Sequence, residues 1–188
     1  MQRPFNSRRQ RGFSLIEVLV TILILSVGLL GIAGLQSRLQ ISEVEAYQRS
    51  QALILLEDMA GRIATNRNAA NSYVTGPTSP VGTGSTCTTS TATRKDVDMG
   101  QWCTALQGGA EREGNSLVGA MIGGRGCVES LGGGEYLITV AWQGMGPISA
   151  PPAGLKCAEK LYTGATGSAC TGELCRRVVS TVVRIATL

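Results

Sequence analysis

The N-terminal part of the chain contains a long apolar segment with a single charge. From Phe13 to Leu35 every residue except Glu17 is uncharged, and most are aliphatic. A helix of this length extends about 34 Å, which is enough to cross a hydrocarbon layer about 30 Å thick. The pattern therefore predicts a membrane-spanning helix.

Helical patterning continues beyond this segment to about residue 66. Four apolar residues recur at intervals of four, three and four and form one stripe: Ala52, Leu56, Met59 and Ile63. Charged residues mark the positions expected to be solvated: Glu43, Glu45, Arg49, Glu57, Asp58 and Arg62. One helix is expected from about residue 14 to residue 66, apolar all round in its first half and amphipathic in its second. The amphipathic half requires a body to pack against.

The residues that follow the helix begin with a stretch of low hydrophobicity. Residues 68–101 are rich in Ser, Thr, Gly and Asn and include Pro77 and Pro80, so we expect a long surface connection. A short helix is expected over residues 98–112, ending near Gly108-Gly109.

Two strands are indicated by alternating side chains, over residues 135–142 and 177–185, and a weaker third over residues 120–128. Gly132-Gly133-Gly134 is expected to form the turn into the first of the two clear strands. The predicted product is a small antiparallel sheet packed on the amphipathic half-helix, which is an α+β head.

The first twelve residues form a basic leader. They contain Arg3, Arg8, Arg9 and Arg11 and no acidic residue. A positively charged segment next to a spanning helix is expected to stay on the cytoplasmic side, which places the C-terminal head on the other side of the membrane. A secretory signal peptide has a shorter apolar stretch with its cleavage site after it. Here the candidate site, Gly12-Phe13, precedes the apolar run, so cleavage would leave the helix on the mature chain. The alternative is an uncleaved single-span anchor.

Removal of the leader changes the charge balance of the chain. The full sequence has 17 basic and 13 acidic residues, and loss of the four leader arginines leaves 13 of each. A mature chain with no general basic surplus is not expected to bind nucleic acid.

The segment from Gly12 to Val20 resembles the class III signal of type IV pilins and of type II secretion pseudopilins. The resemblance implies the type IV pilin fold. It also implies that a prepilin peptidase cuts after Gly12 and methylates the new N-terminal residue, Phe13, and it identifies Glu17 with the family's glutamate.

The chemistry of Glu17 agrees with this resemblance. A carboxylate inside a spanning helix is costly and usually marks a function. In the core of a filament it needs a positive partner, and the amine at Phe13 of a neighbouring subunit is the natural one. We therefore expect Glu17 to set axial register during docking; the alternative is a carboxylate hydrated near the membrane interface. Gly28, Gly31 and Gly34 either soften the helix or permit close packing.

All six cysteines follow the spanning segment, in the half expected to lie in an oxidising compartment. Six cysteines allow 15 pairings. The expected disulfides are Cys87–Cys103, Cys127–Cys157 and Cys170–Cys175. Metal binding is the alternative, but the chain has no histidine and no Cys-x-x-Cys pair, so neither a metal nor a cofactor is expected.

Other possible sites have simpler explanations. Without histidine, Ser-His and Cys-His catalysis is excluded, and we expect no enzyme. The Gly123–Gly126 run is expected to form turns rather than a phosphate loop. Asp96 and Asp98 are expected to be solvated loop residues rather than a calcium pair, and Trp102 and Trp142 to be core residues.

Within the family, the chain is most similar to minor pilins of the PilV group, the type IV pilus modification proteins. The similarity lies in Gly12–Gln36, in Ile138–Gly144, and in Cys175-Arg176-Arg177 before the last strand. It implies a non-enzymatic subunit of the bacterial inner membrane, with its head in the periplasm, that joins other minor pilins and the major pilin at the pilus tip. Together with the inner-membrane assembly platform it would prime assembly and support piliation and twitching.

Two further functions stay open at this point. One is a tip adhesin or DNA-uptake receptor that uses residues 68–101, for which Arg94-Lys95 or Arg176-Arg177 would have to form a basic cluster. The other is a type II secretion pseudopilin, although such proteins are usually shorter and lack this cysteine-rich insertion.

Overall fold

The computed structural model describes residues 12–109, 112–114, 116–117 and 121–186. The leader arginines Arg3, Arg8, Arg9 and Arg11 lie outside the described residues. The chain divides into two compact units, Met1–Ser42 and Glu43–Leu188, and each is described by itself.

Helix α1 (Leu15–Thr65) confirms the predicted long helix. It begins after Ser14, whose carbonyl accepts hydrogen bonds from the backbone N–H groups of Glu17 and Val18, at 3.1 and 3.3 Å. Its residues in the second unit bury the predicted apolar stripe of Ala52, Leu56, Met59 and Ile63. The 3.6-residue period of the sequence therefore reports the packed face of this part of the helix correctly.

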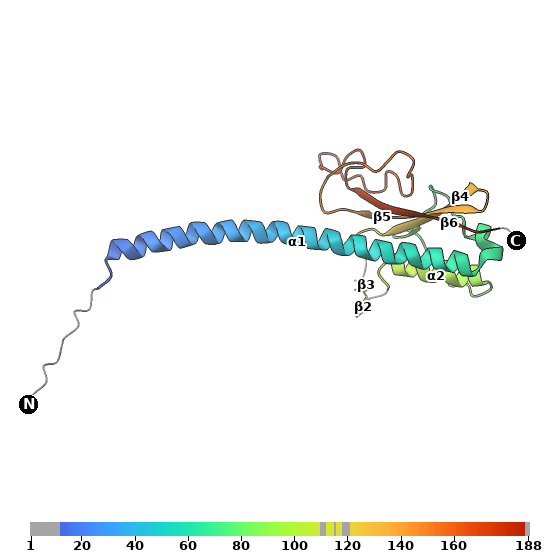
Figure 1. Cartoon of the computed structure of the whole chain (residues 1–188), viewed down its shortest axis with the longest axis horizontal. Helices are drawn as coiled ribbons and strands as arrows, with labels where there is room; N and C mark the ends of the chain where they lie inside the picture. Colours follow the sequence, from blue (N-terminus) through green and yellow to red (C-terminus); the bar gives the residue numbers. More distant parts are fainter. Residues whose placement is uncertain (1–11, 110–111, 115, 118–120, 187–188) are drawn as a thin grey trace, which may run out of the picture. The chain divides into compact units, whose positions relative to one another are not determined.

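The main sheet is antiparallel and has the strand order β1-β4-β5-β6 (Figure 1). The strands are β1 (Val81–Gly82), β4 (Arg125–Gly132), β5 (Glu135–Gln143) and β6 (Arg176–Arg184). The two strands with clear alternation, β5 and β6, match their predicted ranges to within one residue. A second pair, β2 (Arg112–Glu113) with β3 (Ser116–Leu117), was not predicted.

Strand β4 starts later than predicted. The prediction was residues 120–128, but a turn precedes the strand, in which the Gly124 N–H donates to the Met121 carbonyl at 3.2 Å. Gly123 has a φ of +64°, a conformation that favours glycine and interrupts an extended strand. The strand therefore begins at Arg125 and runs to Gly132, where the three-glycine turn leads into β5 as expected.

One face of the sheet packs against helices. The alternating side chains of β5, namely Tyr136, Ile138, Val140 and Trp142, join the buried stripe of α1 in one cluster. Trp102 belongs to the same cluster, and its indole N–H donates to the Leu55 carbonyl of α1 at 2.8 Å. Trp102 and Trp142 are thus core residues, as the sequence predicted.

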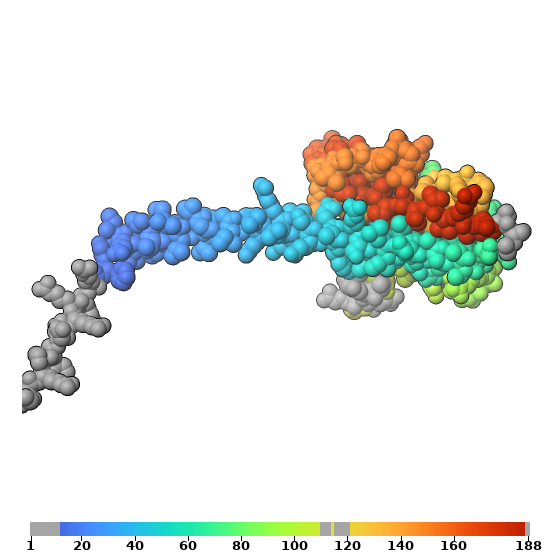
Figure 2. All heavy atoms as spheres, viewed as in Figure 1, coloured from blue at the N-terminus to red at the C-terminus, as the bar shows by residue number. Residues whose placement is uncertain are grey.

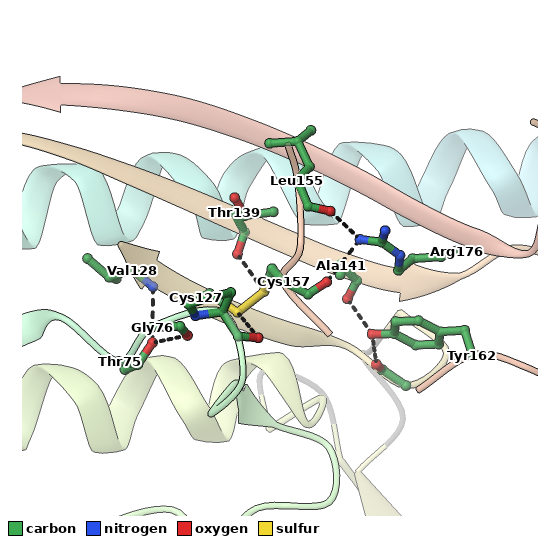
Figure 3. Close-up of a disulfide and its surroundings, with 12 residues drawn as sticks. Thr75, Gly76, Cys127, Val128, Thr139, Ala141, Leu155, Cys157, Tyr162 and Arg176 are labelled. Atoms are coloured by element: carbon green, nitrogen blue, oxygen red, sulfur yellow. Dashed lines mark hydrogen bonds between the residues drawn. A yellow bond between two sulfur atoms is a disulfide. The ribbon is translucent and has the colours of Figure 1, made fainter. Parts of the chain in front are cut away.

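The other face of the sheet is covered by the loop between β5 and β6 (residues 144–175). Cys127 and Ala141 from the sheet form a second cluster with Cys157, Ala158 and Tyr162 from this loop. The Tyr162 hydroxyl lies 2.7 Å from the Gly123 carbonyl oxygen and 3.0 Å from that of Ala141 (Figure 3). A loop of this length is therefore fixed to the sheet by side-chain contacts.

The expectation that residues 68–101 form only a surface connection is wrong. A 3₁₀ helix, η1 (Arg67–Tyr73), covers the start of this range, strand β1 lies within it, and α2 (Arg94–Leu106) starts inside it. Thr93 caps α2 by accepting a hydrogen bond from the Asp96 N–H at 3.1 Å. Tyr73 and Met99 are buried. Helix α2 thus begins four residues before the predicted start and ends at Leu106, before Gly108-Gly109.

The contact between Trp102 and β4 can be tested at Gly126. A Cβ atom at this position would overlap the Trp102 ring. We expect Gly126→Ala to lower the free energy of unfolding by about 1–3 kcal/mol, because the core has no room for the added methyl group. The measurement is urea unfolding of the full chain in detergent, followed by tryptophan fluorescence.

Gly61→Ala is the matched control. Gly61 is exposed in α1, and no atom lies within 4 Å of the added Cβ. This substitution should stabilise the chain by about 0.5–1 kcal/mol through helix propensity. Equal stability of Gly126→Ala and the unsubstituted chain would show that Trp102 does not lie against β4.

Candidate processing and assembly site

The predicted cleavage point lies in a non-helical segment. Gly12, Phe13 and Ser14 precede α1, and all three are exposed, with the Phe13 side chain at 82%. An added Cβ at Gly12 would meet no atom within 4 Å. The peptide bond after Gly12 is therefore accessible to a protease, in backbone that does not have to unwind from a helix first.

Glu17 lies in the first turn of α1 and is exposed. A negative charge is favoured there, because the first N–H groups of a helix carry partial positive charge. Among the ion pairs formed by the described residues, none involves Glu17. Its carboxylate is therefore free of ion pairs with the residues that the structure describes.

The first half of α1 presents apolar side chains on all sides. Within the described part of the chain, α1 is the one helix long and apolar enough to span a membrane. The hydroxyls of Thr21 and Ser26 donate to the Val18 and Ile22 carbonyls, at 2.8 and 2.7 Å. Because these polar groups bond to the helix itself, its outer surface stays apolar and requires a bilayer or other helices to cover it.

The three glycines of this half leave open space on the helix surface. An added Cβ at Gly28, Gly31 or Gly34 would meet no atom within 4 Å. Another helix could approach the backbone closely at these positions.

In the second unit, an unpredicted polar network surrounds Asp98. Its side chain is fully buried, and its carboxylate accepts hydrogen bonds from the Tyr73 hydroxyl at 2.6 Å and from Arg62 at 2.9 Å. Arg94 lies 3.1 Å away, one helical turn earlier in α2. Three elements, α1, η1 and α2, are therefore joined by one carboxylate.

Two predictions about charged residues are corrected by this network. Asp98 was expected to be a solvated loop residue, but it is buried in α2 because three donors replace its water. Arg62 was expected to be a solvated position of α1, but its guanidinium bridges Asp98 and Asp58, the latter at 2.8 Å. Asp96 keeps a surface role in the cap of α2, where it pairs with Lys95 at 3.4 Å.

The network sets the protonation states of its members. Burial alone would raise the pKa of Asp98, but hydrogen bonds from Tyr73, Arg62 and Arg94 hold this pKa below its usual value. Burial, together with the bond to Asp98, raises the pKa of Tyr73. At neutral pH, Asp98 is therefore ionised and Tyr73 is neutral.

One of the two basic pairs considered for nucleic-acid binding, Arg176-Arg177, is occupied by intramolecular contacts. Arg176 is buried, pairs with Glu173 and donates to the Leu155 and Cys157 carbonyls at 2.7 and 3.1 Å (Figure 3). Arg177 donates to the Gly146 carbonyl at 2.6 Å and lies 3.4 Å from Glu45 of α1, another residue expected to be solvated. These arginines hold the head together rather than forming a free cationic surface.

The structure forms the three predicted disulfides. Cys87–Cys103 ties the segment before α2 to that helix, Cys127–Cys157 ties β4 to the loop that covers the sheet, and Cys170–Cys175 closes a short loop before β6. Within the described ranges, no group of three or more cysteine or acidic side chains could hold a metal ion.

Two family models match the chain, one after the other. The prokaryotic N-terminal methylation motif matches residues 7–33, and a model described as type IV pilin Tt1218 matches residues 34–112. The first match contains Gly12, Phe13 and Glu17, and the second runs from α1 through α2 to Arg112. No curated protein and no solved structure matches the chain significantly.

The Asp98 network makes the free energy of unfolding of the folded chain depend on pH in the acidic range. Because the pKa of Asp98 is lower in the folded chain, its contribution is present above the unfolded pKa of about 3.9 and is lost as the pH falls through the folded pKa. We expect Asp98→Asn to cost about 2 kcal/mol at pH 7, through weakened charged hydrogen bonds, and to make the acid-induced loss shallower.

The measurement is urea unfolding at pH 7 and at pH 3. Glu57→Gln, which neutralises an exposed carboxylate of α1, is the control and should leave both values almost unchanged. An Asp98→Asn chain with the acid dependence of the unsubstituted chain would refute the assignment of this titration to Asp98.

Proposed function

We propose that this chain is a minor pilin that primes assembly at the pilus tip. Its matches to the prokaryotic N-terminal methylation motif and to a type IV pilin model support a pilin-type role. The observation that carries the proposal is the arrangement of its N-terminus. The exposed Gly12-Phe13 bond precedes α1, whose first turn carries Glu17, a carboxylate without an ion pair among the described residues, and the apolar surface of the helix needs a partner.

The proposed sequence of events starts in the bacterial inner membrane. The basic leader stays in the cytoplasm, residues 13–35 span the bilayer, and the head lies in the periplasm. A prepilin peptidase then cuts after Gly12 and methylates Phe13. Cleavage creates an N-terminal amine four residues before Glu17 and leaves the spanning helix in place.

Docking would exchange lipid contacts for helix contacts. The assembly platform would move the subunit so that its apolar helix packs among those of other minor pilins and the major pilin. Glu17 would then pair with the Phe13 amine of a neighbour, because an ionised carboxylate without a partner is strongly disfavoured in an apolar core. This pairing would fix the axial register of the two helices.

Assignment as a minor rather than a major subunit rests on similarity to the PilV group. It is supported by the helix segment Ser26–Gly31 and by the strand sequence Ile138–Gly144. Many major pilins carry a proline near the position of Gly34, and this chain does not. Such a subunit would join other minor pilins at the tip and support piliation and twitching.

The structure disfavours two other functions. A DNA-uptake receptor would need a cluster of free basic side chains, whereas Arg176 and Arg177 are engaged within the head, and Arg94 and Lys95 each pair with an aspartate of α2. A secretion pseudopilin would be expected to lack the cysteine-rich region that forms the three disulfides. The proposed role is structural and requires no catalytic group.

The docking role of Glu17 can be tested by Glu17→Ala. We expect a severe loss of incorporation into pili, because the amine of the neighbouring Phe13 would have no carboxylate to pair with. The measurement is the amount of this chain in sheared pili relative to the membrane fraction. Mass spectrometry should show that the leader is still removed, so that the chain starts at Phe13.

Glu43→Ala is the matched control, since it removes a carboxylate of α1 outside the apolar run. It should leave incorporation unchanged. Normal incorporation of Glu17→Ala would refute the docking role, and a mature chain that retains its leader would refute processing.

The priming role is tested by deleting the gene with and without an active retraction motor. We expect surface pili to be lost in the deletion strain and to return when retraction is blocked, because priming shifts the balance between extension and retraction. Pili are counted by electron microscopy. Normal pili with failed adhesion or DNA uptake would replace the proposal with a receptor function, and failed protein secretion would identify a pseudopilin.

A further inference from the structure

Four exposed apolar side chains lie at one end of the second unit. They come from the turn before β4 and from the loop after β5, and we call them the apolar end patch: Ile122, Met145, Ile148 and Leu161, with exposed fractions of 46, 47, 62 and 49%. Hydrogen bonds connect their segments. The Gln143 N–H donates to the Ile122 carbonyl at 2.8 Å, and the segment Glu173-Leu174 accepts hydrogen bonds from the Ile148 N–H at 2.9 Å and from the Lys160 N–H at 2.8 Å. Apolar groups gathered in this way usually mark an interaction surface.

The patch is fixed to the first residues of α1 in the second unit. The Met145 N–H donates to the Glu45 carboxylate at 2.6 Å, and the Ile122 N–H donates to the Gln48 side chain at 3.2 Å. Figure 2 shows the orange loop after β5 and the yellow β4–β5 turn at opposite ends of this unit. The patch therefore lies at the end where α1 enters the head.

Little chain separates this entry point from the apolar segment. Glu45 follows Leu35 by ten positions in sequence, a length of about 15 Å when helical. The headgroup layer extends about 5–8 Å beyond the hydrocarbon on each side. When residues 13–35 span a bilayer, Glu45 thus lies at most about 10 Å beyond the outer edge of the headgroup layer, and a loop that extends from Glu45 toward the membrane can cross this distance.

The chemistry of the loop suits a lipid surface. Residues 144–155 carry no charge and include Pro147, Pro151 and Pro152, and Lys156 follows them. Lys160, beside Leu161, is also exposed, as is Glu159. Apolar side chains flanked by lysines are typical of segments that insert shallowly between lipid headgroups.

We propose that the apolar end patch contacts the bilayer surface before assembly, with Ile148 and Met145 inserted between headgroups. This inference rests on the membrane anchoring in the proposed function. The contact would hold the head against the membrane, and extraction of the helix would release it together with the lipid contacts of residues 13–35.

The test uses three tryptophan variants of the full chain in vesicles of phosphatidylethanolamine and phosphatidylglycerol, with and without brominated acyl chains. Ile148→Trp reports on the patch, Leu131→Trp on the opposite end of the head, and Leu30→Trp on anchoring. All three positions are exposed, so the indole does not disturb the core. Emission from Trp102 and Trp142 is measured in the unsubstituted chain and subtracted.

We expect the brominated lipid to quench the added emission of Leu30→Trp and Ile148→Trp and to leave that of Leu131→Trp unchanged. Met145→Trp should behave as Ile148→Trp does. Quenching at position 30 without quenching at 145 or 148 overturns the inference and leaves anchoring intact, whereas absence of quenching at position 30 overturns anchoring as well.

Two further outcomes would also overturn the inference. Equal quenching at positions 131 and 148 would show unspecific adsorption of the head. The emission of Ile148→Trp could also stay unchanged with brominated lipid and shift to shorter wavelength when other pilins are added. That result would assign the patch to a protein partner.

Discussion

The buried stripe of α1 is the contact on which the second unit depends. Ala52, Leu56, Met59 and Ile63 face one side of the sheet, and Trp102 of α2 closes the same cluster while its indole bonds to α1. A head with few aromatic residues and long irregular segments has no other surface on which to build a core of this size. The same helix thus serves two environments, because its first half keeps every apolar side chain available to lipid or to other subunits.

Asp98 is the polar counterpart of this apolar contact. It lies where α1, η1 and α2 meet, and its three donors come from all three elements. A buried carboxylate without partners would drive these elements apart, whereas the paired one fixes their distances. The Ser- and Thr-rich region, which has little apolar surface, is ordered by this network and by the Cys87–Cys103 disulfide rather than by a large core.

The periodicity of apolar residues was sufficient to predict α1, β5 and β6 from the sequence, because the buried positions of each element recur at a regular spacing. It failed for residues 68–101, where structure depends on a few isolated side chains. Thr93 and Asp96 have the spacing of a helix cap, and Arg94 and Asp98 are one turn apart, so the start of α2 was readable from these residues. The bond from Tyr73 to Asp98 crosses 25 residues and leaves no local pattern.

The candidate processing and assembly site could likewise be predicted from the sequence only in part. Gly12, Phe13 and Glu17 could be placed at the start of a helix, because their spacing from the apolar run is fixed by the chain itself. A partner for the Glu17 carboxylate could not be identified in the same way, since within the described chain it forms no ion pair. The intersubunit pairing proposed for it therefore depends on residues of a second chain, which the sequence of one chain does not locate.

The six cysteines of the head pair first with second, third with fourth and fifth with sixth, so the three covalent loops follow one another without overlap. A head that crosses a membrane from its N-terminal side exposes each thiol's partner before any competing thiol emerges. Oxidation in order of emergence then produces the native set directly, and the slow reshuffling of mispaired bonds is not required. If the head is exported as proposed, it would in this way reach its oxidised state during export, before the proposed extraction of its helix from the membrane.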